Sequence, residues 1–403
     1  MNHLKTIDIL TDYFAEGCKG EETGKLGVEA EHFIVREDTL EAVPYSGEGG
    51  IREVLVKLMD VFPEAVPLDG DDLFGFAAKD FTITLEPAAQ LEISIAPERS
   101  ICCIGEIYRD FIRKLESITA TLGYRILNAG GQVKSRVQEL ELIPKQRYYL
   151  MDKHFLKTGT GGREMMRGTA SVQVSVDYAS EEDFRRKIQA AYYYSPMLKL
   201  FMDNTRTFEG KPVRGFLKRT DIWNRVDPAR CGILPGIFRE DYGFRDYAAF
   251  LCGMPLIFLD GKEEKTYTGF QTVEELYEGK VPDHDEILHI LSMAFPDVRL
   301  KQFLEIRSAD CVPYDRMMGY CALIKGMIYS ETARDEVQRR IREGDLSEDD
   351  IRRTEESFME KGWGGSFYGM PARTAAAEIL ALAETHLTQD EAQYLDAFRS
   401  HEG

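Results

Sequence analysis

The stretch Asp80–Pro97 constrains the fold of this chain more than any other. Its sequence, DFTITLEPAAQLEISIAP, holds two runs in which apolar and polar residues alternate, separated by Pro-Ala-Ala. Alternation with period two is typical of strands with one buried face, so the stretch predicts a β-hairpin. With a three-residue loop, Thr84 faces Glu92 and Glu86 faces Gln90. One face then enters a core, and the other gathers carboxylates that must lie in water or hold a cation.

Composition and charge limit what such a chain can do. Its 403 residues are 43% hydrophobic, which allows a large core. The net charge of −19 argues against binding to nucleic acid or to an anionic membrane. No apolar run approaches the roughly 18 residues of a transmembrane helix, and the first residues do not read as a signal peptide. Seven cysteines without C-x-x-C spacing fit reduced thiols. We therefore expect a cytoplasmic protein that binds neither nucleic acid nor membrane.

Three more strand-like runs carry polar side chains on one face. In KLGVEAEHFIV, Glu29 and Glu31 are two residues apart, which puts both carboxylates on the same side of a strand, whereas His32 points to the core. In KQFLEIRS, Glu305 and Arg307 share a face in the same way. The range Met165–Tyr178 alternates most regularly and is predicted as one strand with a wet face.

The remaining pattern predicts an α+β fold. Helical spacing of apolar residues occurs at 3–18, 51–62, 101–122, 145–157, 180–204, 273–276, 284–293 and through most of 313–403. Residues 255–259 predict a short strand. The region 210–243 is irregular, rich in arginine and lysine, and too apolar for disorder, so we expect it to be functional. We expect one catalytic domain over residues 1–330, with a C-terminal helical segment, residues 331–403, packed on it.

Clustered strand carboxylates raise the possibility of a metal site. Five of them stand in strand-like runs: Glu29, Glu31, Glu86, Glu92 and Glu305. An all-oxygen donor set suits Mg²⁺ or Mn²⁺, which usually handle phosphate. No P-loop or dinucleotide fingerprint is present, and the glycine-rich Thr158–Arg163 is better read as a turn than as a phosphate cradle. Arg307 would then clamp a phosphoryl group or, equally well, pair with a neighbouring glutamate.

Six sequence blocks, found in order, carry a family resemblance. They are GVEAE (27–31), LEPAAQLEIS (85–94), PKQRYYLM (144–151), MMRGTASVQVSVD (165–177), DPARCGILP (227–235) and FLEIRSAD (303–310). Together they resemble the glutamate–cysteine ligase family in its plant and proteobacterial branch. The resemblance implies a fold similar to glutamine synthetase, with an antiparallel sheet curved into a funnel and helices packed on its outer face. Where the family has glycines in the hairpin turn, this chain has Ala88 and Ala89.

The resemblance also implies an activity and a set of site residues. Mg²⁺-ATP would phosphorylate the γ-carboxylate of glutamate, and the amine of cysteine would attack the acyl phosphate to give γ-glutamylcysteine. The five glutamates would be metal ligands. Gln173 would form a polar floor and Arg307 the phosphate clamp, while Arg147 and Arg230 would hold a substrate carboxylate or ATP phosphates. Two alternatives stay open: a ligase of the same fold that uses another amine, and a non-catalytic binding protein.

Overall fold

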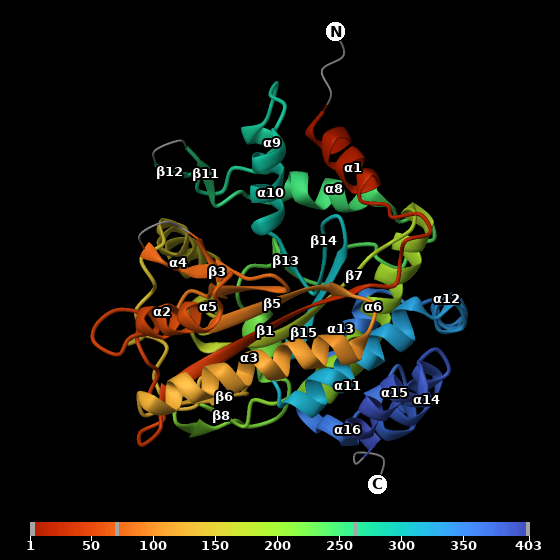
Figure 1. Ribbon diagram of the computed structural model, residues 1–403. Helices are drawn as coiled ribbons and strands as arrows, with labels where there is room; N and C mark the ends of the chain where they lie inside the picture. Colours follow the sequence, from red (N-terminus) through yellow and green to blue (C-terminus); the bar gives the residue numbers. More distant parts are fainter. Residues whose placement is uncertain (1–4, 69–71, 262–263, 400–403) are drawn as a thin grey trace.

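A nine-stranded antiparallel sheet forms the centre of the structure, a computed structural model that describes residues 5–68, 72–261 and 264–399 (Figure 1). Its strands, in spatial order, are β14 (Val298–Leu300), β15 (Leu304–Asp310), β7 (Ser171–Val176), β1 (Leu26–Arg36), β5 (Leu91–Glu98), β4 (Phe81–Leu85), β3 (Gly75–Ala77) and β2 (Val66–Leu68). The ninth, β6 (Tyr124–Leu127), pairs with the far end of β1. Strands from the two halves of the chain meet at β7, which pairs with β1 on one side and with β15 on the other.

The hairpin β4–β5 has the predicted register. Thr84 lies opposite Glu92, and the Glu86 N–H donates to the Gln90 carbonyl at 2.9 Å. Ala89 closes the turn with φ of +64°, a left-handed conformation that costs a residue with a Cβ atom about 1–2 kcal/mol. The turn therefore keeps its shape at the cost of backbone strain.

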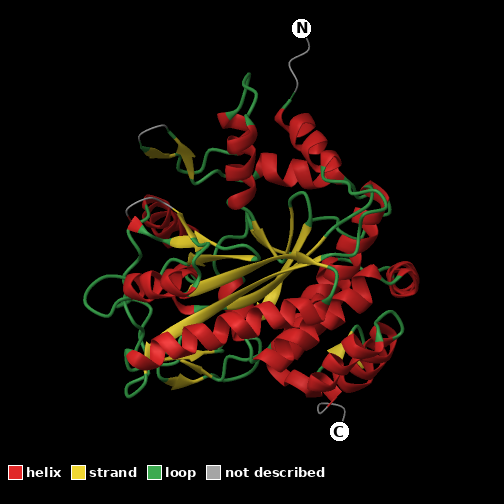
Figure 2. Cartoon of the chain, in the orientation of Figure 1, coloured by secondary structure: helices red, strands yellow, loops and turns green. Residues whose placement is uncertain are grey.

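Three helices cover one face of the sheet, as Figure 2 shows. They are α3 (Ile101–Thr121), α6 (Glu181–Met202) and α11 (Tyr314–Ile324), which contact β1, β5, β7, β14 and β15. The Ser100 and Ser180 hydroxyls cap α3 and α6 by accepting from Cys103 and Asp183 N–H groups. His32 lies on this covered face, 1% exposed, with its Nε2 3.1 Å from the Tyr108 hydroxyl. The α+β fold and the core position of His32 are confirmed.

Shorter elements surround this centre. The other helices are α1 (Thr6–Glu16), α2 (Ile51–Val61), α4 (Gln146–Thr158), α5 (Gly162–Gly168), α7 (Lys218–Trp223), α8 (Phe244–Gly253), α9 (Val273–Leu276), α10 (His284–Ser292), the π-helix Lys325–Tyr329, α12 (Glu331–Gly344), α13 (Glu348–Lys361), α14 (Ala372–Glu384), α15 (Gln389–Ala392), α16 (Asp396–Arg399) and 3₁₀ turns at Gly362–Gly364 and Gln393–Leu395. Two-stranded pairs are β8 (Thr207–Phe208) with β9 (Lys211–Pro212), β10 (Cys231–Gly232) with β13 (Phe295–Pro296), β11 (Phe258–Asp260) with β12 (Lys265–Tyr267), and β16 (Ser366–Phe367) with β17 (Met370–Pro371). Among the described residues, none of the helices has the length and hydropathy to cross a bilayer.

Two strand predictions need correction. The range Met165–Tyr178 is not one strand, because its first part is helix α5 and only Ser171–Val176 is β7. Met165 and Met166 are both buried, whereas adjacent residues of a strand point to opposite faces. The short strand expected at 255–259 begins later, at Phe258. The helix α5 places Met165 and Met166 in the lining of the cavity described next.

Candidate functional site

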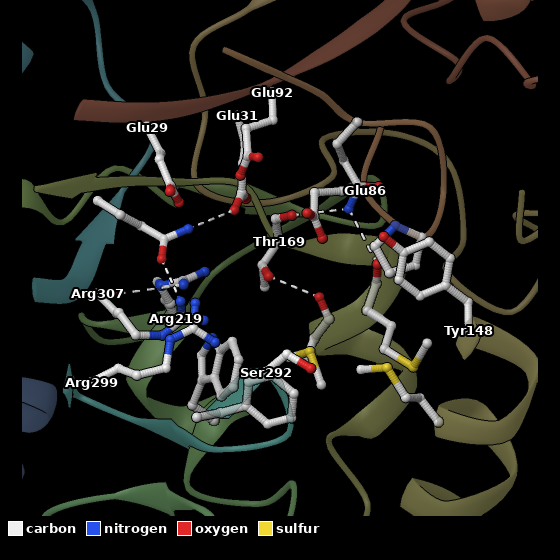
Figure 3. A pocket seen from close by; sticks show the side chains of 18 of the residues that line it. Glu29, Glu31, Glu86, Glu92, Tyr148, Thr169, Arg219, Ser292, Arg299 and Arg307 are labelled. Carbon is white, nitrogen blue, oxygen red and sulfur yellow. Dashed lines mark hydrogen bonds between the residues drawn. The ribbon is translucent and has the colours of Figure 1, made fainter. Parts of the chain in front are cut away.

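The face of the sheet opposite α3 opens into a cavity of about 280 Å³. Its charged lining residues are Glu29, Glu31, Glu86, Glu92, Arg147, Arg219, Arg299, Lys301 and Arg307, with Gln90, Tyr148, Thr169, Gln173 and Ser292 among the polar ones. Figure 3 shows the four carboxylates along one wall and Arg219, Arg299 and Arg307 on the wall facing it. The cavity thus holds opposite charges on opposite walls.

Strand pairing explains how the carboxylates come together. Glu31 on β1 lies opposite Glu92 on β5, and Glu29 lies opposite Gln173 on β7. Glu31 accepts three hydrogen bonds, from the Ser171 N–H and hydroxyl at 2.8 Å each and from the Gln173 amide at 3.2 Å. Its charge is therefore well compensated by the protein.

The other three carboxylates of this wall are poorly compensated. Burial and then repulsion from neighbouring carboxylates raise the pKa of Glu29, Glu86 and Glu92. Within the described residues no donor bonds directly to the carboxylates of Glu29 or Glu86, and Glu92 accepts from the Thr84 hydroxyl at 2.7 Å. Buried acids that repel one another provide oxygen donors and negative charge, which suits a divalent cation.

The carboxylates do not form a ready-made coordination shell. Across residues 5–68, 72–261 and 264–399, no three acidic, histidine or cysteine side chains converge closely enough to hold a metal ion. The donor chemistry and charge of the acidic wall nevertheless fit Mg²⁺, which usually keeps several water ligands and is bound by one or two carboxylates together with substrate phosphates.

Glu305 stands apart from the other predicted metal ligands. It is fully buried, and it accepts from Arg299 at 2.6 Å, Arg307 at 2.8 Å and Lys301 at 3.1 Å. Burial alone would raise the pKa of Glu305, but these three cations outweigh it and hold the pKa well below the ordinary value. The structure therefore shows Glu305 as the common partner of three cations whose side chains line the cavity.

Arg307 and Gln173 lie side by side, as their predicted roles require. The Arg307 guanidinium donates to the Gln173 amide oxygen, and the Gln173 amide nitrogen donates to Glu31. Gln173 thereby links the cationic wall to the acidic wall. Arg307 pairs with Glu305, which confirms the predicted pairing with a glutamate, and it also lines the cavity, where its role as a phosphate clamp stays a prediction.

Arg219 is a cavity residue that the sequence did not reveal. It lies on the short helix α7, is 7% exposed, and has no ion-pair partner within the part of the chain that the structure describes. Its guanidinium lies 5.2 Å from the Trp223 ring centre. The residue before α7, Leu217, has φ of +53°, and Asp203 accepts its N–H at 3.2 Å. Strain of this kind is often found at functional sites.

Arg147 reaches the cavity from α4. It donates to the Ser292 hydroxyl at 3.1 Å and to the Ser292 carbonyl at 3.0 Å, at the end of α10. Glu86 is among the charges nearest to it. Arg147 is therefore placed where a substrate carboxylate or phosphate could be bound, while the neighbouring PKQRYY residue Tyr148 donates to the Leu85 carbonyl.

Arg230 does not reach the cavity, which contradicts its predicted substrate contact. It is fully buried and donates to Asp227 at 2.6 Å, to the Pro255 carbonyl at 2.7 Å and to the Met293 carbonyl at 3.0 Å. These partners neutralise the charge of Arg230 and occupy the N–H groups of its guanidinium. Arg230 ties the segment around Asp227 to β13, where its own carbonyl accepts from the Phe295 N–H.

Substitution of Arg230 by methionine should destabilise the protein without changing substrate binding. Removing one partner of a buried pair leaves the Asp227 carboxylate with only His154 and the Ala229 N–H as partners, so we expect a loss of about 3–5 kcal/mol in the free energy of unfolding. Thermal unfolding measures that loss. The double variant Arg230→Met with Asp227→Leu should recover much of it. An Arg230→Met protein with an unchanged Tm and a raised KM would instead indicate a substrate contact.

In the glycine-rich segment 158–163, the N–H groups of residues 159–161 are bonded within the protein and are not free for a phosphate. The Thr160 and Gly161 N–H groups both donate to the Arg225 carbonyl, at 2.9 and 2.8 Å. The prediction of a turn is confirmed here. The apolar part of the cavity comes from elsewhere and consists of Met151, Met165, Met166, Trp223, Phe295 and Pro87.

Comparison with known proteins gives one consistent result. Residues 25–401 match the model of glutamate–cysteine ligase family 2. The chloroplastic glutamate–cysteine ligase of Arabidopsis thaliana is 31% identical over 334 residues, which cover 81% of this chain and 63% of that enzyme. That of Medicago truncatula is 29% identical over 386 residues, covering 94% and 75%. This chain thus spans less than two thirds of the Arabidopsis protein.

A solved structure shares the fold. A glutamate–cysteine ligase from Francisella tularensis, in complex with AMP, superimposes with a TM-score of 0.57 at 10% sequence identity, over 95% of this chain and 82% of that one. This likeness supports the funnel-like arrangement of an antiparallel sheet with helices outside.

The expected cytoplasmic location is wrong on this comparison. The plant relatives are named as chloroplastic proteins. Composition and the first residues of the chain do not determine a compartment, which is why that inference failed.

Proposed function

Because this chain belongs to the glutamate–cysteine ligase family, we propose that it joins L-glutamate to L-cysteine at the expense of ATP, giving γ-glutamylcysteine. The family expected from the six sequence blocks is confirmed. The observation that carries the proposal is the single cavity with carboxylates on one wall and arginines on the other. Such a cavity can bring together several anions and the cations that neutralise them.

The chemistry requires such an arrangement. A carboxylate is a poor electrophile, so a γ-carboxylate oxygen of glutamate must first attack the terminal phosphorus of ATP, and ADP leaves. The neutral amine nitrogen of the acceptor then attacks the acyl carbon, the bond from carbon to the phosphate oxygen breaks, and inorganic phosphate departs with the proton that the nitrogen loses. Both steps develop negative charge on phosphate oxygens, which fixed positive charges stabilise.

The chain supplies those charges from three segments. Arg307, held by Glu305 and Gln173, and Arg219, on α7, would bind the transferring phosphoryl group. Arg147 would hold the glutamate α-carboxylate or a phosphate of ATP. Mg²⁺ would be held by Glu29, Glu86 and Glu92, where it would supply additional positive charge next to the phosphates.

ATP would extend beyond this cavity. A second cavity of about 730 Å³ shares Glu29 and Lys301 with the first and is lined in part by Phe81, Ile95 and Phe303. The volume of this second cavity and its apolar side chains are suitable for binding the nucleoside part of ATP. The AMP in the solved Francisella enzyme supports nucleotide use within this fold.

A single assay distinguishes the three candidate activities. The purified chain is incubated with ATP, Mg²⁺ and glutamate, and ADP release is followed with and without cysteine, with mass spectrometry of the product. We expect cysteine to accelerate ADP release several-fold and chelation of Mg²⁺ to abolish it. The methionine and aromatic lining would also accept other apolar side chains, so 2-aminobutyrate and leucine complete the panel, with serine as the polar counterpart of cysteine. A response to another amine but not to cysteine would indicate a different ligase, and no response to any amine would indicate a binding protein.

A further inference from the structure

Four side chains separate the main cavity from a much smaller one behind it. Arg219, Trp223, Phe295 and Arg307 line both. The small cavity holds about 20 Å³, enough for one water molecule. On its other side it is lined by Lys199, Asp297 and Ser308. Charged groups that cannot touch a substrate therefore stand directly behind the arginines that would.

These charged groups form a buried triad. The Lys199 ammonium, on α6, lies 2.7 Å from an Asp297 carboxylate oxygen and 2.6 Å from a Glu355 carboxylate oxygen, on α13. The side chains are 6%, 15% and 4% exposed, respectively. Buried ion pairs contribute little net stability compared with apolar residues of the same size. The triad is therefore better explained by the geometry that it imposes on the surrounding chain than by a gain in stability.

Asp297 connects this triad to Arg307 through the main chain. Its carbonyl accepts from the Arg307 N–H at 2.9 Å. At the same point the pairing of β15 with β7 shifts register between Ile306 and Ala309, which leaves Arg307 and Ser308 out of that ladder. Such bulges re-aim a side chain, often beside an active site. Here the Arg307 N–H at the bulge bonds to the Asp297 carbonyl, and the triad fixes the position of Asp297 through its side chain.

We propose that Glu355, Lys199 and Asp297 are positioning residues that fix the bulge at Arg307 and thereby aim the arginines of the cavity. The inference rests on the proposed ligase function of that cavity. It gives the C-terminal segment 331–403 a role in the chemistry, because Glu355 comes from it. None of the three residues lines the main cavity.

Glu355→Gln tests this proposal, since it keeps the shape of the side chain and removes its charge. We expect kcat to fall about 10- to 100-fold, as for other residues that orient catalytic groups. The KM for cysteine should not change, because the arginines act on the phosphoryl group and not on the acceptor. Glu355→Asp should restore part of kcat. The matched control is Glu356→Gln, an exposed residue next to it on α13.

Two further measurements keep the test decisive. Amide hydrogen exchange of the β15 peptide reports the Arg307 N–H bond without any need for activity, and it should be faster in Glu355→Gln than in Glu356→Gln. If Glu355→Gln folds poorly, the variant with Lys199→Met, Asp297→Asn and Glu355→Leu removes all three charges and should remain folded, with slow turnover.

The outcomes separate the two proposals. A wild-type chain without ligase activity would refute the proposed function, and hydrogen exchange would then decide the positioning role alone. An active wild type with equal kcat and equal exchange in the Glu355→Gln and Glu356→Gln variants would overturn the positioning role. A fall in kcat that only follows the unfolded fraction would overturn it as well.

Discussion

Substitution of Arg219 by methionine is expected to abolish most activity while leaving the protein as stable as before, or more so. Removing a donor that stabilises transition-state charge typically lowers kcat by about 10²–10³-fold. Burial lowers the pKa of Arg219, and attraction from Glu31 and Asp310 offsets only part of this effect. Among the described residues nothing neutralises it by an ion pair, so its loss removes an unfavourable burial.

Arg299→Met provides the matched comparison. Arg299 is equally buried but pairs with Glu305 at 2.6 Å, so its loss should lower the Tm as well as the activity. Turnover is measured by ADP release and stability by thermal unfolding. If Arg219→Met lowered the Tm as much as Arg299→Met, or kept its turnover, the proposed role of Arg219 would be wrong.

Substitution of Glu92 by glutamine should make the metal-free protein more stable and its response to Mg²⁺ weaker. Burial and repulsion raise the pKa of Glu92 and its neighbours Glu29 and Glu86, so removing one charge relieves the others. At a hundred times its Kd, a bound ion raises the free energy of unfolding by about 3 kcal/mol. We expect a large part of that Mg²⁺-induced rise in Tm to disappear, together with Mg²⁺-dependent ADP release.

Glu106→Gln is the control for this prediction, since Glu106 is exposed on α3, away from the cavity. It should leave both the Tm and its Mg²⁺ response unchanged. Equal Mg²⁺ responses in Glu92→Gln and Glu106→Gln would show that Glu92 does not bind the ion, whatever happens to activity.

The acidic wall could be predicted from the sequence because strands follow a simple rule. Period-two alternation predicts that Glu29 and Glu31 share one face of their strand and that Glu92 lies on the polar face of the hairpin, and the register confirms their common side. The hairpin register and the core position of His32 follow from the same rule. Alternation does not predict which side chains pair with each carboxylate. Glu305 obeys the rule, yet it is enclosed by three cations from β14 and β15 and the turn between them.

The cationic wall could be predicted only in part: Arg307 follows the alternation of β15, whereas Arg219 comes from a loop-rich region. The region 210–243 was expected to be functional, and it does reach the cavity, but through Arg219 and not through Arg230. Both are arginines in a loop-rich stretch. Only the packing of α7 against α5 and the burial of Arg230 beside His154 distinguish them. A short helix with a left-handed residue before it leaves no periodic signal that could have identified Arg219.

The left-handed Ala89 has a practical consequence for anyone who wishes to engineer this protein. The turn contains Glu86 and joins β4 to β5, the strand that carries Glu92, whereas Ala89 itself is 4% exposed and its N–H donates to the Glu86 carbonyl. Glycine would adopt the same φ without steric penalty. Heat tolerance can thus be sought at Ala89, a buried position beside the proposed active site that contributes no side chain to the cavity.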